Sequence, residues 1–470
     1  MVRKTKIIAT ISNKSCEPEF IERLFKAGIN VVRLNTAHMT HDDALQVIHN
    51  TRQVSDKIAI LIDTKGPEIR TCKSESPMPV KHGDSIRIVG DHNAVSSGDT
   101  LCVSYDNFVR DIPMGSSIMI DDGSIALAVM DKDEKYLYCH VENDGVIGER
   151  KSINIPSVHV KLPALSEKDR KFIEFAADNN IDFIAHSFVR NKEDVLAVQE
   201  ILDRKKSKIK IIAKIENIDG VDNLEEILDQ AYGVMVARGD LAVEIPAERI
   251  PLIQKQIVKS CIRRRRPVII ATQMLHTMIE SPRPTRAEVS DVANACLDHT
   301  DALMLSGETA SGKYPEEAVR TMATIAKEVE TRTSSFVDVP YGSKNKVTAY
   351  LAKAGVKASL RLNTKAILAD SMTGSSIREI AAYRGDNPIF AQVYDETIMR
   401  ELALSYGVYA NFITRDENCL FPFQKVVSTL LKEKRFYSED LVTVIAGNYG
   451  AKKGVSYVEI AEAGAMMGLS

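Results

Sequence analysis

The sequence has no cysteine motif and almost no net charge. Its seven cysteines are an odd number, without Cys-x-x-Cys spacing or a histidine placed to complete a zinc site. This usage argues against a disulfide framework and favours a reducing compartment, which we expect to be the cytoplasm. With 61 Lys and Arg against 64 Asp and Glu, the formal charge is -3. That balance gives no electrostatic reason to expect nucleic acid or an anionic membrane as a partner.

Long hydrophobic runs are also absent. A membrane-spanning helix needs about 18 or more consecutive apolar residues, and no segment approaches that length. The start of the chain, MVRKTKIIATISNKS, has too short an apolar stretch for a signal peptide. We therefore expect a soluble protein. At 470 residues the chain is too long for one ordinary core, so two or three domains are expected.

What the sequence does contain is an alternation of short apolar runs and amphipathic helical stretches. Runs rich in Ile, Val and Leu predict buried strands, and a helical stretch precedes each next strand. Eight such strands are the number that closes a parallel (β/α)8 barrel, a TIM barrel. The predicted strands are residues 6–12, 29–35, 58–64, 181–187, 209–216, 233–240, 267–273 and 301–308.

Two segments break this alternation. Residues 69–158 carry frequent Gly, Asp, Asn and Ser turn signals and alternating stretches such as SIRIVG, which predict a small β-rich domain inserted after the third strand. Residues 337–470 carry strands separated by helices, which predict an open α/β sheet. The barrel is then expected to consist of residues 1–68 and 159–336.

Every predicted barrel strand ends in polar or charged residues. In this type of barrel the chemistry is located at the C-terminal ends of the strands and in the loops that follow. A single polar strand end can be a plain terminus, but Arg, Lys and several carboxylates converging on one rim indicate a site. The strand-end residues are Ser12, Asn13, Arg33, Asn35, Asp63, Thr64, Ser187, Lys214, Glu216, Arg238, Asp240, Thr272, Ser306 and Glu308.

In IIAKIEN, Lys214 and Glu216 lie two residues apart at the end of a predicted buried strand. At strand period they point the same way, and two buried charges side by side are costly unless something binds beside them. Glu216 and Asp240, from neighbouring strands, suit Mg2+ or Mn2+, although a salt bridge to Lys214 or Arg238 would also explain them. RGDLAVEIP predicts a short helix near Asp240 whose free N–H groups suit an anion. A lysine beside such a metal stabilises a phosphoryl group or an enolate, so we predict metal-assisted chemistry on a small phosphorylated anion.

Three other features carry less weight. GETASGKY (307–314) nearly matches a phosphate-binding loop, but Tyr314 stands where the Mg2+-binding hydroxyl is needed, and the barrel already uses this strand. RRRR (263–266) fits a solvated helix end, with an oligomer contact or a phosphate patch as alternatives. His38 and His41 lack nearby Cys or His partners, so a nucleotide or surface role is favoured over zinc.

As continuous stretches of sequence, these rim segments closely resemble those of the pyruvate kinase family. The matching strings are long, ordered and spread through residues 5–315. The resemblance implies a catalytic barrel, a β-barrel lid inserted after the third strand and a C-terminal regulatory domain. It also implies phosphoryl transfer from phosphoenolpyruvate to ADP in glycolysis, and a homotetramer. The strings are DTKGPEIRT (63–71), KIEN (214–217), MVARGDLAVEIP (235–246), ATQML (271–275), RPTRAEVSDVANA (283–295) and LSGETASGKYP (305–315).

The resemblance also implies roles for individual residues. Glu216 and Asp240 would hold Mg2+ or Mn2+, Lys214 would stabilise the phosphoryl group in transfer, and Arg33 would clamp phosphate. Thr272 would lie where the enolate takes its proton, with further residues in the relay. Those relay residues are Ser306 and Glu308. The expected K+ ligands are Asn35, Asp63 and Thr64. The positions expected to touch substrate or nucleotide are Arg33, His38, Arg70, Lys168, Ser187, Phe188, Gly239, Asp240 and Thr272.

The departures from the family pattern concern the cation and nucleotide sites. Ala37, in NTAHM, replaces the serine whose hydroxyl is the fourth protein ligand for K+, while Glu68 is the residue associated with a K+ requirement. We expect weakened or altered K+ activation. Ser12 and Asn13 replace Gly and Pro beside the expected nucleotide, which leaves nucleotide preference open. Ala242 replaces a glycine near the metal loop and requires a negative φ there.

The C-terminal segment resembles the family more faintly. In DSMTGSS (370–376), Ser371, Gly374 and Ser376 resemble the loop that binds the phosphate of a sugar-phosphate effector; the alternative is an ordinary turn between strand and helix. Two functional readings remain, an active pyruvate kinase, or a weakly active or inactive barrel that senses phosphoenolpyruvate or a sugar phosphate. The complete lysine and carboxylate set favours the enzyme.

Overall fold

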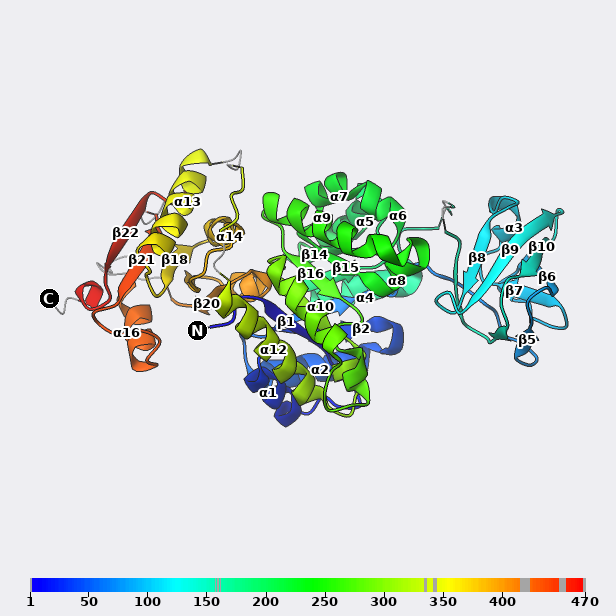
Figure 1. The fold of residues 1–470 in the computed structure, drawn as a ribbon, viewed down its shortest axis with the longest axis horizontal. Helices are drawn as coiled ribbons and strands as arrows, with labels where there is room; N and C mark the ends of the chain where they lie inside the picture. Colours follow the sequence, from blue (N-terminus) through cyan, green and yellow to red (C-terminus); the bar gives the residue numbers. More distant parts are fainter. Residues whose placement is uncertain are drawn as a thin grey trace.

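The computed structural model describes residues 2–156, 158, 160, 162–333, 336–340, 345–414, 423–447 and 454–467. Three bodies follow one another along its long axis, with the barrel in the middle, the inserted β-rich unit at one end and the C-terminal sheet at the other (Figure 1). The expected boundary at residue 159 falls outside the described residues. Among the described residues, no helix has the length and apolarity needed to cross a membrane.

The central body is a closed barrel of eight parallel strands in the order β1-β17-β16-β15-β14-β13-β3-β2. This confirms the predicted (β/α)8 barrel, and each strand lies within its predicted run. The predicted ends are too late by two residues for the first and seventh strands and by three residues for the sixth and eighth. The strands are β1 (Lys6–Thr10), β2 (Val31–Asn35), β3 (Ala59–Asp63), β13 (Phe183–His186), β14 (Lys210–Ile215), β15 (Gly233–Ala237), β16 (Val268–Ala271) and β17 (Ala302–Leu305).

The helices that surround the barrel begin at clear sequence signals. Three of them start with a capping box, in which the side chains of Thr40, Ser166 and Thr285 each accept from a backbone N–H three residues on. The helix α1 ends at Ala27 and is capped by Gly28, whose φ of 128 is strained for any other residue. The surrounding helices are α1 (Pro18–Ala27), α2 (His41–Val54), α4 (Glu167–Asp178), α5 (Lys192–Arg204), α7 (Leu224–Gln230), α9 (Ile250–Arg263), α10 (Arg286–Leu297) and α12 (Pro315–Arg332).

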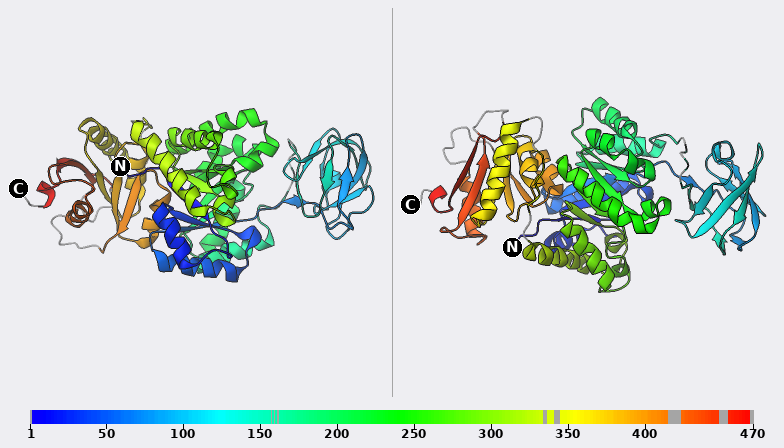
Figure 2. Two further views of the ribbon diagram at one scale, coloured as in Figure 1. Left: turned by 60° about the horizontal axis from the view of Figure 1, so that its bottom comes forward. Right: turned by 45° about the horizontal axis from the view of Figure 1, so that its top comes forward.

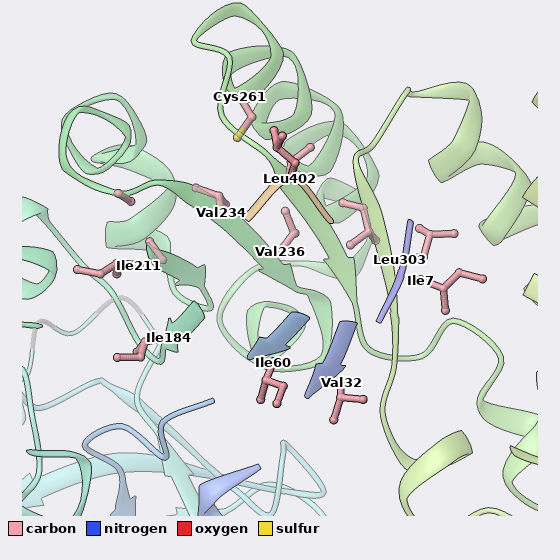
Figure 3. Close-up of a cluster of buried hydrophobic side chains, with 14 of the residues drawn as sticks. Ile7, Val32, Ile60, Ile184, Ile211, Val234, Val236, Cys261, Leu303 and Leu402 are labelled. Carbon is pink, nitrogen blue, oxygen red and sulfur yellow. The ribbon is translucent and has the colours of Figure 1, made fainter. Parts of the chain in front are cut away.

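The barrel strands are buried on both faces, which explains their continuous apolar runs. Outward side chains such as Ile7 and Val32 belong to the cluster beneath the helices (Figure 3). The alternating side chains, including Ile8 and Val31, belong to the cluster that fills the barrel interior. Because the period of a strand is two, Arg33 has the same inward direction as Val31 and lies at the C-terminal end of β2.

The inserted unit is a seven-stranded sheet in the order β4-β12-β8-β9-β10-β6-β7, with a two-stranded sheet of β5 and β11 beside it. An isolated bridge between Thr71, just after β4, and Val103, at the end of β7, joins the two edges and makes the sheet barrel-like. The unit has its own buried apolar cluster, so it packs as a body separate from the barrel core. Its elements are β4 (Ile69–Arg70), β5 (Met78–Val80), β6 (Ser85–Gly90), β7 (Thr100–Val103), α3 (Phe108–Asp111), β8 (Ser117–Ile120), β9 (Ile125–Lys132), β10 (Leu137–Val141), β11 (Gly145–Ile147) and β12 (Ser152–Asn154).

The C-terminal unit is the predicted open α/β sheet, in the order β20-β19-β18-β21-β22 with β22 antiparallel at the edge. It closes the end of the barrel at which the strands begin, because Leu404, in η4 (Leu402–Leu404), packs into the interior barrel cluster. Figure 2 shows this unit and the inserted unit on opposite sides of the barrel. Its main elements are α13 (Lys346–Arg361), β18 (Ile367–Ser371), α14 (Ser375–Ala382), β19 (Ile389–Val393), α15 (Glu396–Glu401), β20 (Val408–Phe412), α16 (Gln424–Lys432), β21 (Leu441–Ala446) and β22 (Tyr457–Glu462).

Candidate active site

A buried charge cluster occupies the C-terminal end of the barrel. Lys214 Nζ lies 3.1 Å from Asp63 Oδ1, 3.0 Å from Glu216 Oε1 and 2.6 Å from Ser187 Oγ. Arg33 Nε lies 2.7 Å from the other oxygen of Asp63. The side chains come from four successive strands of the barrel order, β2, β3, β13 and β14, and all point inward. The structure thus brings together five residues that the strand-end pattern predicted.

The charges in this cluster control one another's protonation. Burial lowers the pKa of Lys214, but Asp63 and Glu216 outweigh this effect and raise it above its ordinary value. Burial raises the pKa of Asp63, yet Arg33 and Lys214 together hold it below the usual range. Burial raises the pKa of Glu216 to about 8, against the opposing attraction of Lys214. Lys214 and Asp63 are therefore charged, while burial favours the neutral form of the Glu216 carboxyl group more strongly than Lys214 opposes it.

Glu216 and Asp240 fit a divalent metal. Asp240 lies in the first turn of α8 (Arg238–Glu244), the short helix predicted from RGDLAVEIP, and its carboxyl group is close enough to that of Glu216 for each to influence the other's pKa. Burial raises the pKa of Asp240 as well. Two carboxyl groups in contact need a shared proton or a cation between them, and oxygen ligands suit Mg2+ or Mn2+. Among the described residues no group of three or more His, Cys, Asp or Glu is placed to hold a metal ion. Mg2+ held by one or two carboxylates commonly takes its other ligands from substrate and water.

The oxygens expected to bind a monovalent cation lie at the neighbouring ends of β2 and β3. Asn35 and Asp63 are paired in register, and the carbonyl of Thr64 accepts from Ser187 Oγ at 2.7 Å. Ala37 follows Asn35 and contributes no side-chain oxygen; its carbonyl accepts from Lys168 Nζ at 3.2 Å. Three of the four expected positions therefore carry an oxygen at these strand ends, and both oxygens of Asp63 are paired with Arg33 and Lys214.

Thr272 has a strained backbone at the end of β16. Its φ is 67, in the left-handed region that β-branched residues avoid, and Gln273 follows with φ 54. The Thr272 hydroxyl accepts from Gly239 N at 2.8 Å and donates to the carbonyl of Ala271 at 2.6 Å. Strain of this kind persists only where the surroundings hold it, and it is concentrated at functional sites.

Glu308 braces the loops beside Thr272. It is 2% exposed, and its two carboxylate oxygens accept from the backbone N–H groups of Leu275, at 3.2 Å, and Ser306, at 2.8 Å. The loop after β16 and the loop after β17 are therefore tied to one carboxylate. This places both predicted relay residues next to the loop of Thr272.

A cleft of about 750 Å³ separates the barrel rim from the inserted unit. Arg70, in β4, lines the cleft and donates to Glu68 Oε2 and to the carbonyl of Arg150, both at 2.6 Å. Phe188, with φ 56, lines the cleft and donates its N–H to Glu216 Oε2 at 2.7 Å. Other lining residues are Asn35, His38, Asp121, Asp122, Asp240 and Glu244.

Some predicted strand-end residues lie outside this cluster. Because β1 ends at Thr10, Ser12 donates to the carbonyl of Ala310 and Asn13 donates to Asp43 instead of facing Lys214. Thr10 itself was missed: its hydroxyl accepts from Arg33 Nη1 at 2.9 Å. The available signal was its position two residues after the inward Ile8. The predicted effector residues Ser371, Gly374 and Ser376 lie in the C-terminal unit, at the turn between β18 and α14.

Comparison with known proteins agrees with this layout. Residues 2–319 match the family description "Pyruvate kinase, barrel domain", and residues 350–461 match "Pyruvate kinase, alpha/beta domain". The chain belongs to the pyruvate kinase family. It is 49% identical over 464 residues to a pyruvate kinase of Borreliella burgdorferi, with 97% of this chain and 96% of the relative covered. A Staphylococcus aureus pyruvate kinase is 42% identical over 456 residues, covering 95% of this chain and 78% of the relative.

A solved structure supports the same assignment. The crystal structure of a pyruvate kinase from Cryptosporidium parvum superposes with a TM-score of 0.91 at 34% identity, covering 98% of this chain and 96% of that one. As a member of the pyruvate kinase family, this chain is a phosphotransferase. Its Ala242 lies inside α8 and has no positive φ, so the methyl group in place of glycine is accommodated.

Proposed function

We propose that this chain transfers the phosphoryl group of phosphoenolpyruvate to ADP, giving pyruvate and ATP, as the pyruvate kinase step of glycolysis. The observation that carries the proposal is the Lys214 ammonium, held between Asp63 and Glu216 at the C-terminal end of the barrel. A lysine that stays charged beside a carboxylate pair suited to Mg2+ is the arrangement that phosphoryl transfer needs.

The reaction breaks the bond between phosphorus and the enol oxygen of phosphoenolpyruvate, and an oxygen of the ADP terminal phosphate takes the phosphoryl group. A divalent metal held by Glu216 and Asp240 would neutralise charge on the phosphate and enolate oxygens. Arg33, fixed by Asp63 and Thr10, binds the phosphate, and Lys214 stabilises the phosphoryl group during transfer. The enolate then takes a proton at its methylene carbon from a water molecule beside the Thr272 hydroxyl.

The remaining predicted residues serve the nucleotide and the closure of the site. His38, Arg70 and Lys168 contact the nucleotide, while Ser187, Phe188 and Gly239 form the substrate wall. In this proposal residues 69–158 are a lid that closes on the barrel of residues 1–68 and 159–336, because phosphoryl transfer needs aligned reactants and a site without bulk water. Ser306 and Glu308 hold the loops around the proton-transfer position.

A monovalent cation, K+, would be held by Asn35, Asp63 and Thr64. The lack of a hydroxyl at Ala37 supports weakened K+ activation. Residues 337–470 form a regulatory unit, in which a loop at Ser371, Gly374 and Ser376 binds the phosphate of a sugar-phosphate effector. The family supports a homotetramer.

The test is turnover of phosphoenolpyruvate with ADP and Mg2+, followed through lactate dehydrogenase. We expect pyruvate formation that requires both ADP and the divalent metal. A folded protein that binds phosphoenolpyruvate but forms no pyruvate with any nucleoside diphosphate would support the sensor function instead.

A further inference from the structure

Arg238, the first residue of α8, has no role in the proposed reaction, yet its guanidinium is largely buried. Its side chain is 11% exposed, and it bridges two other elements. Nη2 donates to the backbone carbonyl of Thr272, after β16, at 2.7 Å. Nη1 donates to Asp291 Oδ1, on α10, at 2.8 Å. One side chain thus connects α8, the loop after β16 and α10.

Arg238 hydrogen-bonds to Thr272, whose backbone is strained. Thr272 has φ 67, and the hydrogen bond from Arg238 fixes its carbonyl while Gly239 N fixes its hydroxyl. Two consecutive residues of α8 therefore hold both polar ends of Thr272. A β-branched residue leaves this backbone region when such contacts are lost.

An ordinary ion pair between α8 and α10 would explain the contact with Asp291 alone. It does not explain the second hydrogen bond, to the carbonyl of a residue in a disfavoured conformation. The planar guanidinium can supply both bonds at once with a fixed angle between them, whereas a lysine ammonium would hold them less rigidly. The use of both Nη atoms favours a positioning role over a purely structural one.

We propose that Arg238 is a positioning residue that holds the Thr272 hydroxyl at the point where the enolate receives its proton. This inference rests on the proposed function. The hydrogen bonds and ion pairs of Lys214 with Asp63, Glu216 and Ser187 do not include Arg238. Loss of Arg238 should therefore slow proton transfer at carbon while leaving phosphate binding largely intact.

The experiment compares wild type with Arg238→Met and Arg238→Lys. Two quantities report proton transfer. The first is the exchange of pyruvate methyl hydrogens with D2O, followed by NMR with Mg2+ and ATP present. The second is the D2O isotope effect on kcat for phosphoenolpyruvate turnover. For Arg238→Met we expect exchange to fall about tenfold or more, the isotope effect to rise, and KM for phosphoenolpyruvate to stay within about twofold. Arg238→Lys should recover part of the exchange, because one hydrogen bond can still form.

Arg249→Met, at an exposed arginine in η2 (Ala247–Arg249), is the matched control and should behave as wild type. Equal falls in exchange and turnover with an unchanged isotope effect and a raised KM would overturn the inference, as would unchanged exchange. If Arg238→Met does not fold, as shown by loss of a cooperative melting transition, the same measurements on Arg238→Lys decide whether the inference holds. Failure of the wild type to turn over phosphoenolpyruvate would be distinct, because it would refute the proposed function itself.

Discussion

At the residue scale, the period of the strands determines which polar side chains meet. The sequence predicted that Lys214 and Glu216 point the same way, and the structure confirms the pair at 3.0 Å. It could not show that β1 ends at Thr10, since Ile11 and Ser12 continue a plausible strand pattern. Nor could it show that Thr272 has a positive φ, because this conformation depends on contacts from α8, which is distant in sequence.

Ala37→Ser tests the missing cation ligand at this scale. Adding a hydroxyl beside Asn35 and Asp63 should restore one oxygen ligand, so half-maximal activation should need about tenfold less K+, the effect of roughly 1.4 kcal/mol. The measurement is phosphoenolpyruvate turnover as a function of K+ concentration at fixed Mg2+. Ala247→Ser, at an exposed alanine, is the control. An unchanged K+ requirement in Ala37→Ser would show that position 37 does not limit cation binding.

At the scale of elements, the sequence predicted the barrel strands and the short helix α8 well because each has a clear apolar period or turn signal. The contacts of the segment after β3 were harder to predict. Gly66 there has φ 77, and a Cβ atom at this position would lie 2.7 Å from Cδ2 of the Phe188 ring. Phe188 in turn donates to Glu216. The link between Gly66, which precedes the inserted unit, and the carboxylate of Glu216 is a contact between distant segments, which no local pattern encodes.

Gly66→Ala tests this link. The added methyl group should displace Phe188 and loosen its hydrogen bond to Glu216, lowering kcat/KM by about tenfold and weakening Mn2+ binding. Gly115→Ala is a close control, since Gly115 has φ 78 but nothing within 4 Å of the added Cβ. It should carry only the backbone strain, about 1 kcal/mol of stability, with activity unchanged. Equal loss of activity in both variants would mean that strain, not the Phe188 contact, is responsible.

At the scale of the whole molecule, pattern alone predicted three bodies and placed the chemistry at the barrel rim, and the family resemblance added which reaction it is. The contacts that join the bodies were not predictable, because they pair single residues from distant segments. Arg384 pairs with Asp301 at 2.6 Å, and Arg400 pairs with Asp182 at 2.7 Å, tying the C-terminal unit to the barrel. Lys6, the first residue of β1, donates to the carbonyl of Val408 across the same junction.

Lys6 should give this junction a pH dependence. Burial lowers its pKa from 10.5 to about 7, so between pH 7 and 10 the unfolded chain holds a proton that the folded chain has released. Stability should therefore rise with pH over this window, by up to about 1.4 kcal/mol per unit from this group. Lys6→Met should lose that contribution. Urea unfolding midpoints at pH 7 and pH 9 measure it, with Lys171→Met, at a lysine 64% exposed, as control. Equal pH slopes in wild type and Lys6→Met would contradict the assignment.

The central claim is that Lys214 drives phosphoryl transfer at the C-terminal rim of the barrel. The most direct measurement is kcat for phosphoenolpyruvate and ADP in Lys214→Ala and in Lys208→Ala, whose lysine precedes the same strand but is 73% exposed. We predict that Lys214→Ala loses at least about a thousandfold in kcat, as expected for removal of a charge that acts on the transition state, and that Lys208→Ala retains wild-type turnover. A folded Lys214→Ala protein with wild-type kcat would contradict the account.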